Sequence, residues 1–576
     1  MQGLRALQQI VVAWGVVAWL SWSCACALPA QVPTPASPPQ SAVPAAPSRD
    51  PLPQSDRVAG RLRAIRVSTD EVFHDAERSG RVLPRLVNAV HVTTDRDVVL
   101  REVFVQPGEW IDVSQAEELE RNLRALGIFA EVRVQLVRTN VPLEVDLVIV
   151  TRDRLTLILG GGASYVGGVS GFNVAAGESN LRGQGDRVAG TFRDSSDGEF
   201  RGAVSYSDLH LFDTWIRGNV RLSRTDEGDG LGLEVERPWK HLKDPQSWRL
   251  ALAHDELAAD YFRLGEEEGS VPYRRLALDS SLLWADGPRY DRSGFGGTAR
   301  IEQLEYGEAT GALAPELRVP GDTVRLFAGG TFRGQWISAF REASAFDTLG
   351  FVQDIALATQ LEVTLGGSLR DEAGRGTELQ PELQLHAGTV FEPWAATLLG
   401  LSTDGTIRFA NGAAVGFNVS ARTQWLSAVA KHHALAGQLR FDAVDEEQDL
   451  TAELTLGADN GLRGYDARLL SGTHRLLANL EERWDTGLEI WVFRLGLCAF
   501  TDVGWMGRSE ALGRPFVGAG GGVRVGSAPL LGAPVLRIDL ARPLDDVDGN
   551  MDGWNLAVTV GQAFTFGGAS RPSQGR

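Results

Sequence analysis

From Arg154 to Phe566 the chain alternates apolar and polar residues with a period of two, and this pattern restricts its fold more than any other feature. In "IWVFRLGLCAFTDVGW", every second residue from Trp491 to Trp505 lies on one mostly apolar face. At a rise of ~3.3 Å per residue and a tilt of ~40°, the two tryptophans lie about one bilayer apart. An apolar face bounded by aromatic residues is typical of a strand that crosses a membrane.

Charged residues recur on the opposite face of these segments. "WIRGNVRLSR" places Arg217, Asn219 and Arg221 on one face, and "VLRIDLA" does the same with Arg537 and Asp539. Such residues would be costly in a dry core, whereas a water-filled lumen solvates them. Strands in lipid must close into a barrel to satisfy their backbone groups. The predicted fold class is therefore an all-β transmembrane β-barrel of about 16 antiparallel strands. A soluble β-sandwich array is the alternative, which the polar inner faces disfavour.

The N-terminus carries an export signal. Arg5 precedes the apolar run "IVVAWGVVAWL", which is followed by "CACALPA". This pattern predicts a secretory signal peptide over residues 1–27, cut after Ala27 or Ala30. Lipoprotein processing before Cys24 or Cys26 is the alternative.

Composition and charge limit the partners and define the remaining segments. Residues 28–61 are rich in proline and alanine and are predicted to form an extended linker, and residues 567–576 form a C-terminal tail. Cys498 is the only cysteine beyond the signal region, so no internal disulfide is expected. The net charge of −18 argues against a nucleic-acid partner. It does not argue against a bilayer, because membrane barrels carry charges in the lumen and loops.

Residues 62–152 have the mixed pattern of a small α+β domain that precedes the barrel at 153–566. "LVNAVHVTT" predicts a strand, "RDVVLREVF" a short helix, and "SQAEELERNLRALG" a second helix. Ser114 and Glu117 have the spacing of a capping box, and Gly127 ends that helix. Two alternating strands follow, in "AEVRVQL" and "LEVDLVI".

This order of elements, with the phrases "VFVQPGEW" and "LRALGIFAEVRV", resembles a POTRA (polypeptide-transport-associated) domain. One copy is evident. Residues 62–86 are too short for a second copy and are interpreted as an N-terminal extension.

Three motifs in the barrel region resemble a known family. "GLRGY" (461–465) resembles the tip of the sixth extracellular loop of the BamA/TamA superfamily of outer-membrane assembly barrels, also called the bacterial surface antigen family. "ESNLRGQG" (178–185) resembles its NLLGTG-type turn, and "FTDVGW" (500–505) its FxDxG strand. The resemblance covers most of the mature chain and implies that the GLRGY loop folds back into the lumen.

The residues around this loop suggest an ion-pair site. Alternation in "LANLEERW" points Glu481 into the lumen, and the same rule points Asp502 inward from the next strand. Arg463 can then reach carboxylates from two adjacent strands. The family resemblance implies the same roles for these three residues. An exposed loop arginine is the alternative.

The other residues of the GLRGY motif are expected to shape the loop tip and pack it against the wall. Gly461 and Gly464 allow a tight turn close to the barrel wall, and Tyr465 is expected to pack beside the tip.

The last strand is predicted to close the barrel against the first. "GQAFTF" contains Gly561, Phe564 and Phe566 in the spacing of an outer-membrane β-signal, although Val560 replaces the usual polar residue before it. The partner strand is "LTLILGGGASY", in which glycines such as Gly161 weaken packing at the seam.

The resemblance implies a machine that inserts or translocates polypeptides, with client strands pairing at an exposed barrel edge. It implies location in the bacterial outer membrane, with the POTRA-like domain in the periplasm. Expected partners are the outer-membrane lipid bilayer, unfolded outer-membrane or secreted polypeptide clients, and periplasmic or lipoprotein subunits. A passive or substrate-specific channel, or a surface antigen, is the alternative on the same fold.

No enzymatic activity and no cofactor are expected, because no nucleophile elbow, zinc spacing or catalytic carboxylate pair is evident. "DVDGNMDG" offers Asp548, Asn550 and Asp552 as a weak calcium candidate. Thr559 stands where an EF-hand has glutamate, so an acidic hairpin loop is the favoured interpretation.

Overall fold

The computed structural model describes residues 59–70 and 92–560, apart from 167–168, 197–199, 240–244, 288–290, 345–351, 395, 431, 445–452, 491–492, 509–511, 528–534 and 546–552. Several predictions fall outside this range: the signal peptide (1–27), most of the linker, the tail (567–576), the calcium candidate Asp548, Asn550 and Asp552, and the closing residues Gly561, Phe564 and Phe566.

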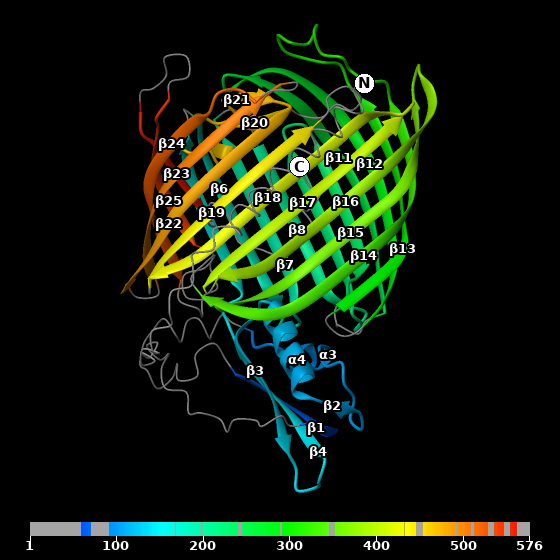
Figure 1. Cartoon of the computed structure of the whole chain (residues 1–576), viewed down its shortest axis with the longest axis vertical. Helices are drawn as coiled ribbons and strands as arrows, with labels where there is room; N and C mark the ends of the chain where they lie inside the picture. Colours follow the sequence, from blue (N-terminus) through cyan, green and yellow to red (C-terminus); the bar gives the residue numbers. More distant parts are fainter. Residues whose placement is uncertain are drawn as a thin grey trace, which may run out of the picture.

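A small α+β domain lies below one end of a large barrel (Figure 1). Its strands pair in the order β2-β1-β4-β3, with β1 parallel to β4 and the other pairs antiparallel. We call the barrel end next to this domain the near end and the opposite end the far end. The domain's elements are β1 (Gly60–Asp70), α3 (Arg96–Arg101), β2 (Trp110–Ile111), α4 (Val113–Ala125), β3 (Phe129–Arg138) and β4 (Glu144–Asp153).

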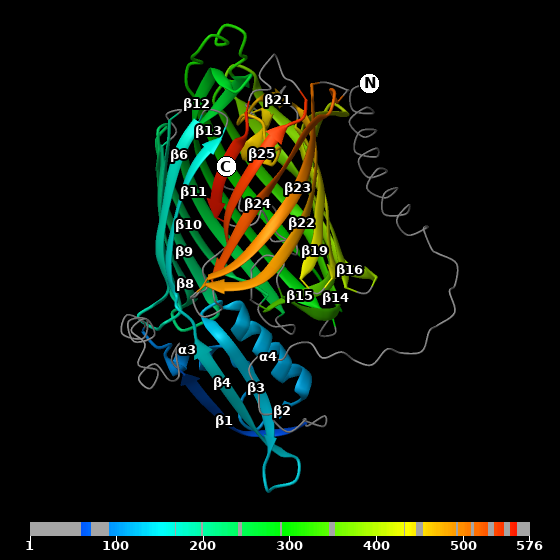
Figure 2. The same ribbon diagram turned by 90° about the vertical axis from the view of Figure 1, so that its left-hand side faces the viewer.

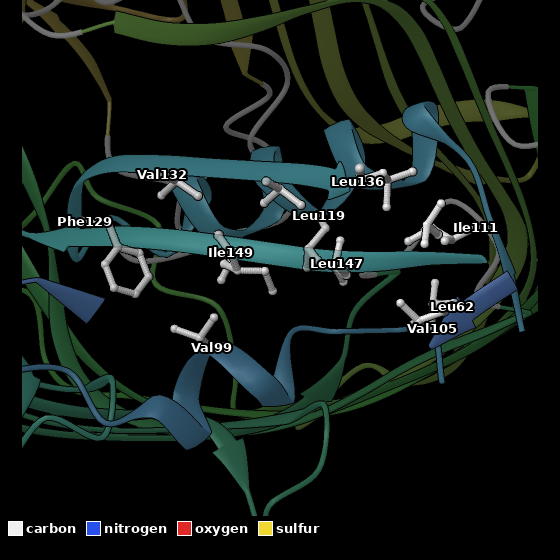
Figure 3. Close-up of a cluster of buried hydrophobic side chains, with 14 of the residues drawn as sticks. Leu62, Val99, Val105, Ile111, Leu119, Phe129, Val132, Leu136, Leu147 and Ile149 are labelled. Atoms are coloured by element: carbon white, nitrogen blue, oxygen red, sulfur yellow. The ribbon is translucent and has the colours of Figure 1, made fainter. Parts of the chain in front are cut away.

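The apolar faces of these elements form one core between the sheet and the helices (Figure 3). Leu119 and Leu123 of α4 meet Leu147 and Ile149 of β4, and all four side chains are almost fully buried. Burying a side chain of this size contributes about 1.5–3 kcal/mol, so this core stabilises a domain without disulfides.

Three details of this domain differ from the sequence predictions. Residues 62–70 are not an extension, because β1 occupies an inner position of the sheet, where it pairs with β4. The cap of α4 is Asp112, which accepts a hydrogen bond from the backbone N–H of Gln115, rather than Ser114 with Glu117. The strand expected over 86–94 lies mostly outside the described residues, and 92–94 are not strand.

The barrel confirms the predicted fold class but has more strands than predicted. Neighbouring strands pair antiparallel from β5 onward, and β26 lies beside β5 and closes the barrel. Among the described residues the barrel comprises twenty strands, β5–β19 and β22–β26, instead of about 16.

The first ten barrel strands are β5 (Leu157–Val166), β6 (Val169–Leu181), β7 (Asp186–Ser195), β8 (Phe200–Leu211), β9 (Ile216–Thr225), β10 (Asp229–Arg237), β11 (Gln246–Arg263), β12 (Glu266–Asp286), β13 (Asp291–Tyr306) and β14 (Thr323–Ser344). The others are β15 (Val352–Glu372), β16 (Gly376–Trp394), β17 (Thr397–Ala410), β18 (Ala413–Ala430), β19 (His433–Val444), β22 (His474–Ile490), β23 (Phe493–Gly507), β24 (Phe516–Ser527), β25 (Leu536–Pro543) and β26 (Asn555–Val560).

The two faces of the barrel wall have opposite chemistry. Outward positions carry exposed apolar side chains such as Phe295, Leu365 and Trp554. Inward positions carry charged side chains, many of them joined across strands, as in the Arg249–Glu234 pair at 2.7 Å. This is the pattern of a barrel whose outer surface meets lipid. No helix among the described residues is long and apolar enough to cross a bilayer.

Candidate functional site

The loop between β19 and β22 folds into the barrel lumen. Its described part, residues 453–473, contains the short antiparallel strands β20 (Leu454–Leu456) and β21 (Leu470–Gly472) and the 3-10 turn η1 (Ala458–Asn460). Leu462 and Tyr465 at the tip are buried against Leu477 of β22 and Phe516 of β24. The tip is thus packed on the inner wall and is not exposed at the far end.

Arg463 lies at the centre of this contact and binds three carboxylates. Its Nε and Nη2 donate to the two oxygens of Asp502 at 2.7 and 2.8 Å. Its Nη1 donates to Glu481 at 2.5 Å and to Asp539 at 3.3 Å. Arg463 is 4% exposed and Asp502 is fully buried. A bidentate arginine–carboxylate pair fixes both distance and plane, so the guanidinium is held in one orientation.

Neighbouring charges balance the three carboxylates. Arg483 contacts Glu481 at 2.9 Å, and Arg524 donates to Asp539 at 2.5 Å. Buried charges remain stable only when each is paired and hydrogen-bonded. Arg537 is a fourth arginine at the site and contacts Asp539 at 3.3 Å. We call Arg463, Arg483, Arg524 and the three acids the charge cluster.

Uncharged residues complete the site around the guanidinium. The amide of Asn479 donates to Asp502 at 2.6 Å and to the carbonyl of Gly461 at 2.8 Å, which joins the loop to β22. The guanidinium carbon lies 3.5 Å from the centroid of the Phe500 ring, a cation–π contact.

The glycines of the motif allow the close approach of loop and wall. Gly464 has φ +96°, and an added Cβ would lie 2.7 Å from the backbone of Arg542 in β25. Gly461 also has a positive φ, +105°. On the wall, an added Cβ at Gly518 would lie 2.0 Å from the carbonyl oxygen of Arg463. Side chains at these positions would separate the loop from the wall.

Two further bonds tie the tip to the last strands. The hydroxyl of Tyr465 donates to the carbonyl of Val517 at 2.8 Å, and its ring meets Phe516 edge to face. Asn555 of β26 donates to the carbonyl of Gly464 at 2.5 Å. The loop therefore contacts every strand from β22 to β26.

The sequence analysis named Arg463, Glu481, Asp502, Gly461, Gly464 and Tyr465, and the structure brings all six together. It did not name Asp539, Asn479, Phe500, Gly518 or Asn555 as site residues. For Asp539, Asn479 and Phe500, strand alternation was a signal, since it places all three on the inner face. Gly518 and Asn555 had no comparable signal.

The ESNLRGQG turn (178–185) contacts the N-terminal domain. Asn180 donates to the hydroxyl of Thr94 at 2.8 Å, and the backbone N–H of Asp95 donates to the carbonyl of Gly183 at 2.8 Å. An added Cβ at Gly183 would lie 2.5 Å from the carbonyl oxygen of Thr93. This turn is a docking surface between the barrel and the domain.

The next near-end turn extends that interface. His210 of β8 lies 2.8 Å from Glu102, which follows α3, and both side chains are buried. Trp215 donates to the carbonyl of Arg101 at 2.6 Å. On the opposite side of the barrel mouth, Arg121 of α4 lies 4.0 Å from the ring of Phe340 in β14. The domain thus reaches from the β8–β9 turn across to β14.

The barrel seam joins β26 to the glycine-rich strand β5. β25, the neighbour of β26, has 8 residues, whereas β14 has 22. Gly161 lies in β5 and pairs with Val174 of β6, within a run of three glycines. Figure 2 places this seam between β6 and β8–β10 on one side and β22–β25 on the other.

No family model and no curated protein matches the chain. Similar solved structures include BamA from Haemophilus ducreyi lacking POTRA domains 1–3, with 12% identity over 87% of this chain and 84% of that one and a TM-score of 0.36. CdiB from Escherichia coli has 11% identity over 87% and 76% and a TM-score of 0.44. CdiB from Acinetobacter baumannii has 11% identity over 87% and 74% and a TM-score of 0.39. The chain is thus similar to BamA and CdiB, and the function proposed below depends on its own residues.

Proposed function

We propose that this chain is an outer-membrane barrel that assists the insertion or translocation of polypeptides, with a POTRA-like domain in the periplasm. The observation that carries the proposal is the unequal support of the barrel wall. The loop and the charge cluster tie β22–β26 together, whereas β5, the partner of β26 across the seam, contains a run of three glycines. Because the loop holds β22–β26 together, we expect the barrel to open first between β26 and β5.

An opened seam presents unpaired backbone groups of β5 and β26. Such an edge is a template for another extended chain, which pairs through main-chain hydrogen bonds. A client strand that enters there would extend the barrel sheet in contact with lipid. Because the three glycines of β5 have no side chains, fewer packing contacts are lost when β5 and β26 separate.

The N-terminal domain offers a second edge of this kind. β3 is the last strand of its sheet in the order β2-β1-β4-β3 and has 10 residues. An extended client segment can add to this edge before it reaches the barrel. The contacts of Glu102 with His210 and of Arg121 with Phe340 hold the domain beneath the barrel mouth.

The test is a folding assay with the full chain in liposomes. We would measure the insertion rate of an unrelated unfolded outer-membrane barrel, with Arg463→Ala and Arg468→Ala variants alongside. Arg468 is a matched control, because it lies in the same loop and its side chain approaches Asp459 and the ring of Phe262, outside the charge cluster. We expect acceleration by the unmodified chain and by Arg468→Ala, and its loss in Arg463→Ala. The absence of acceleration by a correctly folded unmodified chain would refute the proposal.

A channel is the second candidate function, and the lumen-facing side of β7–β9 favours it. Most inward side chains there are polar, and Arg187, Thr191, Arg193, Arg201 and Arg221 are exposed. Steady conductance in a planar bilayer, together with no effect on client insertion, would favour a channel over an insertase.

A further inference from the structure

Four arginines lie on the lumen face of three consecutive strands: Arg187 and Arg193 on β7, Arg201 on β8 and Arg221 on β9. Cross-strand register places Arg193 opposite Arg201, Arg187 opposite Ser207, and Arg221 opposite Ser205. The alternate positions of these strands carry the outward apolar residues Phe192, Val204 and Leu222, of which Val204 is 57% and Leu222 is 55% exposed. All four arginines therefore point into the barrel.

These arginines differ from those on the next strands. Arg249 contacts Glu234 at 2.7 Å, and Arg300 contacts Asp279 at 2.5 Å. Within the described part of the chain, none of the four arginines on β7–β9 forms an ion pair, and all four are exposed. One carboxylate, that of Asp459 in the inward loop, lies within electrostatic range of Arg193. This wall of the lumen therefore carries an excess of positive charge in a chain whose net charge is −18.

Arg193 and Arg201 form a like-charged pair across two neighbouring strands. Directly opposite side chains in a sheet have Cβ atoms ~4.5–5.5 Å apart, and like charges at this separation are destabilising. An oxyanion between the two guanidinium groups would turn this repulsion into two charge-assisted contacts. The planar donor pattern of arginine fits phosphate and carboxylate oxygens.

The remaining two arginines extend the site along the wall. Arg187 lies six positions before Arg193 on β7, roughly 20 Å away at ~3.3 Å per residue. Along the barrel axis, Arg221 lies between Arg187 and Arg193. Its partner Ser205 lies on β8 between Arg201, which pairs with Arg193, and Ser207, which pairs with Arg187. The four side chains form a column that runs from near end to far end.

The barrel has room for a solute beside this column. Barrels of ~16–18 strands already leave a water-filled channel, and this one has twenty described strands. The tip of the inward loop packs on the wall formed by β22–β26. Farther along the loop, Ser471 donates to the carbonyl of Phe262 in β11 at 2.8 Å, and Asp459 lies within electrostatic range of Arg193. The arginine column is on a different part of the wall, β7–β9, on the other side of the seam (Figure 2).

We infer that the arginine column, Arg187, Arg193, Arg201 and Arg221, is a binding track for oxyanions of the phosphate type. The ligand is a phosphate group, either free in solution or on the headgroup of a small lipid. Rings or lines of arginine in a pore select anions by the same chemistry. The inference does not depend on the proposed insertase function, because it concerns the opposite side of the seam.

The first test is calorimetric titration of the full chain in nonionic detergent at fixed ionic strength. Pyrophosphate is the free probe and dihexanoyl phosphatidic acid is the lipid probe, so the arms distinguish the two sources. The test variant is Arg193→Gln/Arg201→Gln. The control is Arg224→Gln, because Arg224 is also an exposed arginine of β9 but faces outward and lies 3.5 Å from Asp229.

We expect at least one probe to bind, and binding to weaken about tenfold or more per arginine removed, the value of one charge-assisted hydrogen bond. Arg224→Gln should bind like the unmodified chain. Equal binding by all three proteins, or no binding of either probe to the unmodified chain, would overturn the inference. Because the substituted side chains are exposed, heat-modifiable migration should show all three barrels folded.

The second test is the reversal potential in a planar bilayer under a KCl gradient. The unmodified barrel should prefer chloride over potassium, and Arg193→Glu/Arg201→Glu should move the reversal potential toward potassium. An unchanged reversal potential in a conducting variant would count against the track. If neither protein conducts, the titration alone decides.

Discussion

Replacing Arg463 with alanine removes the one side chain that contacts all three carboxylates of the charge cluster. The consequences differ among the three acids. Glu481 keeps Arg483 at 2.9 Å, and Asp539 keeps Arg524 at 2.5 Å. Asp502 keeps the amide of Asn479 but loses the two side-chain bonds that balance its charge. The variant thus leaves one fully buried carboxylate without a countercharge.

The expected cost follows from that single carboxylate. Removing one partner of a buried ion pair costs about 3–5 kcal/mol, mostly because the other charge remains buried. The neutral double variant Arg463→Ala/Asp502→Asn should cost only about 1–2 kcal/mol, since it loses hydrogen bonds but leaves no lone charge there. The double variant should therefore be about 2–3 kcal/mol more stable than Arg463→Ala alone, and any cost of Asp502→Asn alone adds to the coupling in the double-mutant cycle.

Native-state proteolysis of the loop at 445–473 measures this cost, because cleavage follows the fraction of molecules in which the loop is open. A cost of about 3–5 kcal/mol raises that fraction more than about a hundredfold. The control Arg468→Ala loses a cation–π contact with Phe262 and a distant contact with Asp459. It should cost about 1 kcal/mol and raise cleavage about fivefold. Additive effects of the Arg463 and Asp502 substitutions, or equal cleavage of the two alanine variants, would refute the reasoning.

Three further perturbations test other contacts. Gly464→Ala should speed loop cleavage more than Gly412→Ala, because both have positive φ but only Gly464 faces a close backbone neighbour. Glu102→Ala removes the buried contact with His210, costs about 1–3 kcal/mol of domain docking, and should increase proteolysis at the domain boundary. Hydrogen bonds from β1 arginines hold the pKa of Asp146 below its usual range. This acid therefore stabilises the domain above about pH 3.9, and the contribution is lost as pH falls through the lowered pKa. Domain proteolysis followed from pH 6 to pH 2 should show that loss, and Asp146→Asn should abolish the dependence.

The alternation of polar and apolar residues along each strand was enough to predict which side chains face the lumen, but not which of them reach Arg463. Glu481 and Asp502 could be placed in the lumen because side-chain direction in a strand has a period of two. The same rule placed Asp539 inward. Nothing local indicated that its strand lies within reach of Arg463, which is 76 positions away in sequence. Membership of the site depends on which strands are neighbours, and that is a property of the closed barrel.

Strand number and sheet order were harder to predict for a similar reason. Strand length varies from 8 residues in β25 to 22 in β14, so the length of the barrel region does not give the number of strands. In the N-terminal domain, β1 pairs with a strand some eighty residues away, as in Leu62 with Val145. A short alternating segment without a neighbouring partner therefore looked like an extension.

The sequence order of the charge cluster has a consequence for how the barrel is built. Arg463 precedes all of its carboxylate partners in the chain, Glu481, Asp502 and Asp539, and Asn555 follows them. The bonds of Arg463 with Asp539 and of Gly464 with Asn555 therefore form only when the last strands have taken their places beside the loop. The loop tip is fully held only in a barrel whose C-terminal strands are in place.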